Sequence, residues 1–214
     1  MQHRFFCIRS VKCFASASVT LVLLISIVPV AECQRAAQLL KEGSRYQAAD
    51  DTSDQAADLY RQLIRKYPKS AEAESAQFFL GAYYERKFFI LEQRSKVPDW
   101  GSLNRAEEEL YTYKGKYPRG FYLADAFHML AIAALRRGYK DTARNWWTIM
   151  SEAATKDRQV YIFRITWSSS TDDVIKGYCK TSALATASVD ALNKESSFDG
   201  VVRALTSWAR GNCH

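Results

Sequence analysis

The chain has 214 residues, 48% of them hydrophobic, with only nine Gly and four Pro. This composition excludes a disordered chain and fits one folded, mostly helical domain, since domains typically have ~100 to 150 residues. The formal net charge is +7, but basic and acidic residues alternate along the chain, as in "YERK" from Tyr84. Such alternation is typical of solvated helix faces, whereas a nucleic-acid surface needs basic residues clustered on one face, so we expect no nucleic-acid partner.

Residues 1–33 have the pattern of an export signal. Three basic residues between Arg4 and Lys12 precede an uncharged, apolar stretch over residues 13–30, as in secretory signals. We therefore expect residues 1–33 to be a signal peptide or a lipoprotein signal and anchor, and the rest of the protein to be exported. An uncleaved membrane anchor stays an alternative, because this stretch is close to the ~20 residues that span a bilayer.

Two processing sites remain open at the end of this segment. Cleavage before Gln34 would place Ala31 and Cys33 at the two positions that require small residues. Cleavage before Cys33 would instead leave a lipid-modified cysteine as the N-terminus and a membrane tether. Glu32 weakens the second alternative, since lipoprotein signals have Gly or Ala at that position.

From residue 36 to residue 154 the apolar residues recur at helical steps of three and four. Tyr67-Pro68 and Tyr117-Pro118, fifty residues apart, each end a helix, because proline disfavours the helical conformation in the residue before it. Ala56 and Ala106 stand twelve residues before these prolines, and a leucine stands twelve residues after each. This echo predicts repeated helix pairs that stack by burying each face against the next pair.

The residues of the echo carry a family resemblance. "LGAYY" over residues 80–84 contains the L-G-x-x-Y pattern of the tetratricopeptide repeat, and Ala56, Ala106 and Ala143 match the small residue of its second helix. The chain thus resembles tetratricopeptide repeat proteins over residues 36–154. This resemblance implies an all-α, helical-hairpin solenoid of about three helix pairs, followed by a C-terminal capping segment.

A narrower resemblance follows from "YPKSAEAESA" over residues 67–76, which is similar to repeats of BamD-like and YbgF (CpoB)-like proteins of the bacterial cell envelope. It implies a non-enzymatic scaffold or adaptor that binds a protein or peptide in the periplasm or at the periplasmic face of the outer membrane. A role in outer-membrane protein assembly is one expectation. The chain departs from the pattern, since BamD has five helix pairs and CpoB an N-terminal coiled coil. The alternative is a membrane-tethered structural envelope protein without a peptide groove.

The resemblance also suggests where a partner would bind. In such a solenoid the groove is lined by the first helix of each pair, which makes Tyr83, Tyr84, His128 and Arg136 candidate partner-binding residues. Each of them could instead pack in the interior or face solvent. We expect Tyr83 or Tyr84 to fill the seam between helices and the other to face the groove.

The second unit is longer than a 34-residue repeat by thirteen residues between Tyr84 and Ala106. Pro98, Asp99 and Gly101 favour a turn in this insert, so we expect two lengthened helices and a tip loop carrying Trp100. Trp100 is a candidate partner contact because Trp is enriched among binding hot spots. The alternative is that Trp100 folds back onto the helix ends.

The pattern fails after residue 154, which divides the chain into a repeat domain at 34–155 and a mostly helical C-terminal cap at 156–214. Helices are expected near 172–194 and 198–210, while "VYIFRITW" over 160–167 could be a strand or the start of a helix. An oxidising compartment would permit a disulfide between Cys179 and Cys213. The alternative is two unpaired thiols.

Catalytic motifs are missing from the sequence. It contains no H-E-x-x-H, no glycine-rich phosphate loop and no G-x-S-x-G elbow. His128 and Asp125 lie at helical spacing, but a packed or surface histidine explains them as well as acid-base chemistry. We therefore expect no enzyme activity, no cofactor and no metal, with a hydrolase site in the C-terminal tail as a minor alternative.

Overall fold

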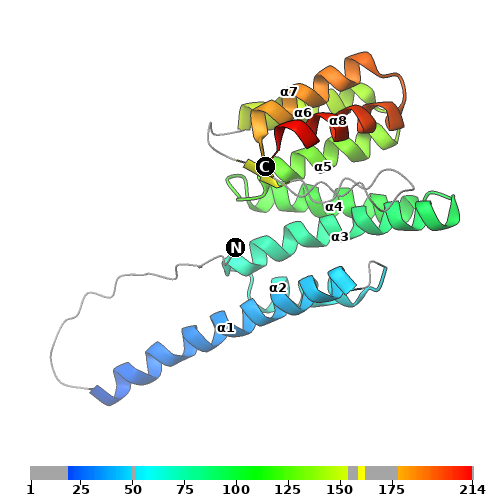
Figure 1. Ribbon diagram of the computed structural model, residues 1–214. Helices are drawn as coiled ribbons and strands as arrows, with labels where there is room; N and C mark the ends of the chain where they lie inside the picture. The colour runs from blue at the N-terminus through cyan, green and yellow to red at the C-terminus, as the bar shows by residue number, and fades with distance from the viewer. Residues whose placement is uncertain (1–18, 50–51, 154–158, 162–177, 214) are drawn as a thin grey trace.

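A computed structural model describes residues 19–49, 52–153, 159–161 and 178–213. The described residues are almost entirely helical, which confirms the all-α prediction (Figure 1). The helices in this part of the chain are α1 (Val19–Ala49), α2 (Gln55–Lys66), α3 (Ala71–Ser95), α4 (Trp100–Lys116), α5 (Leu123–Arg136), α6 (Lys140–Ala153), α7 (Thr181–Lys194) and α8 (Phe198–Asn212).

The helix ends coincide with turn signals in the sequence. Tyr67 and Tyr117, the residues before the two prolines, are the C-terminal caps of α2 and α4. The Ser70 hydroxyl accepts a hydrogen bond from the backbone N–H of Ala73 and so caps the N-terminus of α3. Gly138 adopts φ 83° between α5 and α6, a left-handed conformation that glycine adopts without steric cost.

The helices stack in chain order, each against the next. Besides these contacts, α1 packs on α3 and α3 packs on α5. Figure 1 shows the layers rising from α1 at one side of the stack to α7 at the other, with successive helices running in opposite directions. The N-terminal part of α1 extends past α2 and away from the stack.

A glycine allows the closest approach between α3 and α4. A Cβ atom on Gly81 would lie 2.8 Å from Cγ of Leu110 and 3.5 Å from the carbonyl oxygen of Ala106. Aromatic side chains fill the neighbouring core: the ring of Phe78 stacks on Tyr122 with centroids 4.6 Å apart. The largest hydrophobic cluster of the described residues joins α5, α6, α7 and α8 around the buried Trp147.

The C-terminal segment adds a short antiparallel ladder and two helices. β1 (Gln159–Tyr161) pairs with β2 (Tyr178–Lys180), and Val160 lies opposite Cys179. The start of the ambiguous 160–167 segment is thus a strand, and residues 162–177 lie outside the described residues. The expected boundary between the repeat domain and the C-terminal cap, at residue 155, also lies outside them. α7 and α8 end at or within two residues of the expected positions. The helix expected over 172–194 is wrong at residues 178–180, which form β2, so α7 begins at Thr181, while residues 172–177 lie outside the described residues.

A disulfide joins Cys179 in β2 to Cys213, which directly follows α8. The bond closes a loop of 34 residues along the sequence. It therefore ties the end of the C-terminal helix to the strand that precedes α7.

Candidate functional site

Both tyrosines of the "LGAYY" motif are buried in the helix stack. Tyr83 is 0% exposed and Tyr84 is 1% exposed, and their rings meet edge to face with centroids 5.1 Å apart. The Tyr83 hydroxyl donates to the carbonyl oxygen of Ser53 at 2.7 Å. The expectation that one of the pair faces a groove is wrong, because the long α3 helix is covered by α2 on one side and α4 on the other.

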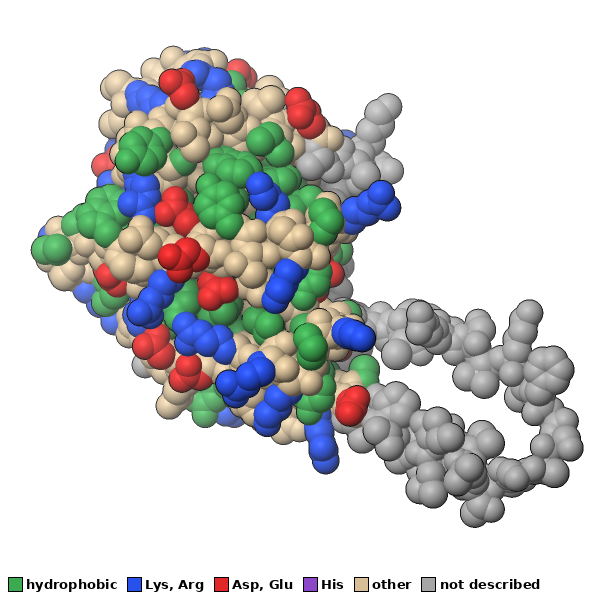
Figure 2. All heavy atoms as spheres, turned by 180° about the vertical axis from the view of Figure 1, so that it is seen from behind, with side chains coloured by type: hydrophobic (Ala, Val, Ile, Leu, Met, Phe, Trp, Pro, Cys, Tyr) green, Lys and Arg blue, Asp and Glu red, His purple; other side chains and the backbone are tan. Residues whose placement is uncertain are grey.

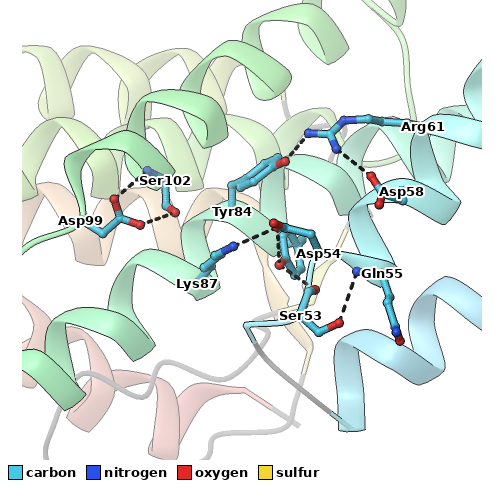
Figure 3. A network of polar contacts seen from close by, with 10 residues as sticks. Ser53, Asp54, Gln55, Asp58, Arg61, Tyr84, Lys87, Asp99 and Ser102 are labelled. Atoms are coloured by element: carbon cyan, nitrogen blue, oxygen red, sulfur yellow. Dashed lines mark hydrogen bonds and ion pairs between the residues drawn. The ribbon is translucent and has the colours of Figure 1, made fainter.

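A polar network surrounds these tyrosines and links α2 with α3 (Figure 3). The carboxylate of Asp54 accepts a hydrogen bond from Nζ of Lys87 at 2.8 Å and another from the Tyr83 hydroxyl at 3.1 Å. The hydrogen bond from Lys87 is the main cause that lowers the pKa of Asp54 below its ordinary value. Asp54 is therefore an ionised, internally paired group.

Arg61 completes the network on the other side of Tyr84. Its guanidinium donates to the Tyr84 hydroxyl and, at 3.1 Å, to the carboxylate of Asp58. The guanidinium of Arg105 on α4 also lies 5.6 Å from the centre of the Tyr84 ring, within the range of a cation–π interaction. The network thus joins three helices, and its charged groups have partners within the chain.

His128 on α5 is a packed core histidine. Its side chain is 8% exposed, and its Nδ1 accepts a hydrogen bond from Nε1–H of Trp147 on α6 at 3.1 Å. Burial lowers the pKa of His128 to about 4, so the imidazole is neutral at physiological pH. The interpretation of His128 as a groove residue is therefore wrong. The structure instead has the alternative, a histidine packed in the interior.

Arg136 lies at the surface where α3 and α5 meet, but the start of α8 covers it. Its half-buried guanidinium forms an ion pair with Glu92 on α3 and lies 5.0 Å from the centre of the Phe198 ring. Phe89 on α3 stacks on the same ring at 6.4 Å. Arg136 therefore holds α3, α5 and α8 together, so it is not open to a partner, and the sequence carried no signal that α8 would fold back onto this surface.

Trp100 is the most exposed of the predicted partner-binding residues, with 40% of its surface exposed. Trp100 is the first residue of α4 and directly follows the turn of residues 96–99. It therefore lies at the start of a helix and not in the tip loop that the sequence predicted. One part of its ring packs on Phe88 with centroids 5.6 Å apart. The guanidinium of Arg137 lies over the ring at 5.3 Å. The side chain thus folds back onto the helix ends and still presents an indole surface to solvent.

Three residues at the α3–α4 turn and the α5–α6 turn were missed by the sequence reasoning. Val97 is 65% exposed and Tyr139 is 61% exposed, and Arg137 is held over the indole by the carboxylate of Glu107 at 2.7 Å. We call Val97, Trp100, Arg137 and Tyr139 the Trp100 patch. In a stack of antiparallel helices, the α3–α4 turn and the α5–α6 turn lie at the same end. This alternation of helix direction is the signal that could have predicted the patch.

A second exposed aromatic group lies on α4 and α6. Tyr111, which is partly exposed, meets Trp146 with centroids 5.8 Å apart, and Nζ of Lys114 lies 5.1 Å from the Trp146 ring. Figure 2 shows hydrophobic side chains gathered among charged ones on the face behind Figure 1. The neighbours Trp146 and Trp147 divide between surface and core because successive helix residues point about 100° apart.

Cys33, the predicted lipidation site, has an exposed side chain on α1. The helix runs through this position from Val19 to Ala49 without a break, so the expected boundary at residue 33 falls inside a helix. Cleavage and lipidation at this position stay predictions. Within the residues that the structure covers, no helix combines the length and the apolar character needed to cross a bilayer.

The described residues contain no group of three or more His, Cys, Asp or Glu side chains that could hold a metal ion. Comparisons of the chain with protein-family models, with curated proteins and with solved structures found no match. The class that the fold itself defines is an all-helical protein. A narrower class rests on the repeat pattern and is therefore a proposal.

Proposed function

We propose that the chain is an exported, non-enzymatic helical adaptor of the tetratricopeptide type that binds a protein partner in the bacterial cell envelope. Its repeat domain takes part in protein–protein interaction, and outer-membrane protein assembly is the process that the BamD-like sequence pattern suggests. The proposal has two parts, a repeat architecture and a partner-binding surface, and a different observation supports each.

The close approach at Gly81 supports the repeat architecture. Gly81 of α3 packs on Ala106 and Leu110 of α4, and Gly81 and Ala106 stand at positions where the tetratricopeptide pattern has small residues. The contacts of α1 with α3 and of α3 with α5 are also those expected when the first helices of successive pairs lie side by side.

The Trp100 patch is the single observation that carries partner binding. Its Trp, Tyr and Arg side chains are the residue types enriched among binding hot spots. The contacts of the indole with Phe88 and Arg137 hold it in place before a partner arrives, which reduces the entropy lost on binding. A fixed, exposed indole beside a guanidinium fits a protein surface better than it fits a small polar ligand.

The test is a site-specific photocrosslink from position 97 in cells that express the full chain. A photoreactive phenylalanine at Val97 should give a discrete crosslinked species that is identified by mass spectrometry. The additional substitution Trp100→Ala should weaken the crosslink at least about thirtyfold, the effect of losing a hot spot of ~2 kcal/mol. The matched control Tyr111→Ala, also a partly exposed aromatic on α4, should leave the crosslink intact.

The outcomes separate the parts of the proposal. A crosslink that is equally strong with Trp100→Ala, or equally weak with Tyr111→Ala, would contradict the Trp100 patch as the binding surface. A crosslinked partner from the outer-membrane assembly machinery would support the assembly role. A cell-wall or unrelated partner would remove that role and leave the adaptor function.

The exposed Cys33 favours a second candidate, a membrane-tethered structural protein of the envelope. Its side chain is accessible on α1, as a modification site must be. Radiolabelled palmitate should then be incorporated into the wild-type chain and lost in Cys33→Ala. A mature N-terminus at Gln34 would contradict this candidate and leave the adaptor without a lipid tether.

A further inference from the structure

A lysine ends α3 in a conformation that lysine disfavours. Lys96 has φ 60° and ψ 11°, in the left-handed region, and it is the one non-glycine residue with a positive φ in the described part of the chain. Helices that end in this way usually have Gly or Asn at the position, because a Cβ atom meets the backbone there. Strain of this kind points to a role other than folding. The next residue is Val97 of the Trp100 patch.

A second lysine lies at an unfavourable place on the neighbouring turn. Lys140 is the first residue of α6, and the helix dipole opposes positive charge at a helix N-terminus. Lys140 directly follows Tyr139, the other strongly exposed residue of the Trp100 patch. Each turn of the patch thus places an exposed apolar side chain next to a lysine whose position local stability does not explain.

The acidic residues of these two turns have partners within the chain. Asp99 caps α4, since its carboxylate accepts hydrogen bonds from the backbone N–H and the hydroxyl of Ser102. The other carboxylates at the turns form ion pairs, which are Asp141 with Arg144, Glu92 with Arg136 and Glu107 with Arg137. Neither Lys96 nor Lys140 forms an ion pair among the residues that the structure describes. Both ammonium groups are therefore available to a partner.

A partner that covers the exposed apolar residues must also satisfy the two lysines. Val97 is 65% exposed and Tyr139 is 61% exposed, so burying them is a large part of what a partner gains here. Each has a lysine as its neighbour in sequence, and an ammonium group that loses water without gaining an opposite charge costs free energy. A partner with carboxylates that reach both turns avoids this cost.

The charges of this end of the stack do not suit a polyanion. The α7–α8 turn meets the end of α5 through the contact of Phe198 with Arg136, and it carries Glu195 and Asp199. These carboxylates would repel a nucleic acid or an anionic bilayer, both of which present negative charge over a wide area. A protein segment with a few carboxylates can pair with the two lysines and leave the α7–α8 turn uncovered.

We propose that the partner of the Trp100 patch is an acidic protein segment. Its carboxylates pair with Lys96 and Lys140, and an apolar side chain between them packs on Trp100. This inference rests on the proposed function, because it takes the Trp100 patch as the surface to which the partner binds. It adds the chemistry by which that partner is recognised.

The test uses the photocrosslink from position 97 in cells that express the full chain. The variant Lys96→Gln/Lys140→Gln should lower the yield of the crosslinked species about tenfold. Lys96→Arg/Lys140→Arg, which keeps both charges, should retain the yield. The matched control Lys69→Gln/Lys116→Gln removes two exposed lysines from the Tyr-Pro turns and should also retain it. Mass spectrometry should locate the crosslink in a partner segment with an excess of Asp and Glu.

A single substitution at the strained position separates binding from folding. Lys96→Gly relieves the left-handed conformation, so it should raise the Tm of the purified chain by about 2–4 °C and at the same time weaken the crosslink. A lysine that served the fold alone would give the opposite result, a lower Tm and an unchanged crosslink.

The outcomes distinguish this inference from the proposed function. A crosslink that Trp100→Ala weakens but that the glutamine pair leaves unchanged would overturn the acidic segment and leave the adaptor surface. An equal loss in the arginine pair or in the control, or a crosslink to a neutral or basic segment, to lipid or to nucleic acid, would also overturn it. Absence of any crosslink, or a crosslink that is insensitive to Trp100→Ala, would instead contradict the adaptor surface and this inference with it.

Discussion

The indole N–H of Trp147 donates a hydrogen bond to Nδ1 of His128 across the interface of α5 and α6. A nitrogen that accepts a hydrogen bond carries no proton, so the imidazole is neutral and its proton is on Nε2. Burial favours the same form and lowers the pKa of His128 to about 4. The interface between the two helices thus depends on the protonation state of one histidine.

Acid should therefore destabilise the protein through His128. Well above the pKa of 6.5 that His128 has in the unfolded chain, the imidazole is neutral in both the folded and the unfolded protein. It therefore makes stability independent of pH in that range. Below that value the unfolded chain binds a proton first, so the free energy of unfolding falls as the pH approaches about 4, by about 3 kcal/mol in total. Urea unfolding between pH 7.5 and 4.5 measures this loss.

The variant His128→Gln is the control for this pH dependence, since its amide oxygen can still accept the bond from Trp147 but does not titrate in this range. It should cost about 1 to 3 kcal/mol at pH 7.5 through imperfect packing and should show a smaller loss on acidification than the wild type. Parallel curves for the two proteins would contradict a neutral, buried His128.

The glycine in "LGAYY" allows a second test, on packing. A Cβ on Gly81 would lie 2.8 Å from Cγ and 2.9 Å from Cδ2 of Leu110, so Gly81→Ala should separate α3 and α4 and cost about 1 to 3 kcal/mol. The gain of roughly 0.5–1 kcal/mol that alanine has over glycine in a helix offsets only part of this cost. Thermal unfolding should show a lower Tm.

Gly115 on α4 is the matched control, because a Cβ there would meet nothing within 4 Å. Gly115→Ala should leave the protein unchanged or stabilise it by up to about 1 kcal/mol. If both substitutions raise the Tm, the close approach of α3 to α4 at Gly81 is absent in solution.

The sequence was sufficient for the helices whose ends carry local signals. Each Tyr-Pro turn gives a helix end by itself, because the proline ring restricts the residue before it, and Ser70 caps α3 in the way its side chain predicts. The L-G-x-x-Y pattern also singled out Gly81, which lies against Leu110 of α4 in the structure. These features depend on residues near each other in the chain.

The candidate binding residues could not be predicted in the same way. Tyr83 and Tyr84 are both buried, and neither faces a groove, because α2 and α4 enclose α3 on both sides. Arg136 is covered because α8, more than sixty residues later, places Phe198 on it. Burial of this kind depends on contacts distant in sequence, which helical periodicity does not report. The same reason explains why Arg137, whose guanidinium lies over the Trp100 ring, was missed, and Tyr139 two residues later with it.

Glu85 on α3 should also make stability depend on pH, with the opposite sign. Burial raises the pKa of Glu85 to about 8, and the carboxyl has no hydrogen-bond or ion-pair partner among the residues described here. The folded state therefore keeps the proton that the unfolded chain releases above about pH 4.5, and stability is lost as the pH rises from there to about 8.

The isosteric Glu85→Gln removes this dependence. It should stabilise the protein at pH 8.5 by about 1 to 2 kcal/mol, less than the full pKa shift implies because the side chain is partly exposed. It should change little at pH 5. A variant that gains nothing at pH 8.5 in urea unfolding would show that Glu85 is ionised and hydrated in the folded protein.

The disulfide between Cys179 and Cys213 should stabilise the C-terminal part of the chain. Closing a 34-residue loop restricts the unfolded chain by about 3 to 4 kcal/mol in the loop-entropy model. The double variant Cys179→Ser/Cys213→Ser should therefore unfold at lower denaturant concentration, and a reducing agent should shift the wild type to the same midpoint. Cys33→Ser, the same chemical change at the exposed cysteine of α1, should leave the midpoint in place.

Because Cys213 directly follows α8, loss of the disulfide should raise amide hydrogen exchange first in α8, including at Phe198, whose ring meets Arg136. If exchange in α8 stays unchanged, the packing of Phe198 on Phe89 and Arg136 holds the helix without the covalent bond.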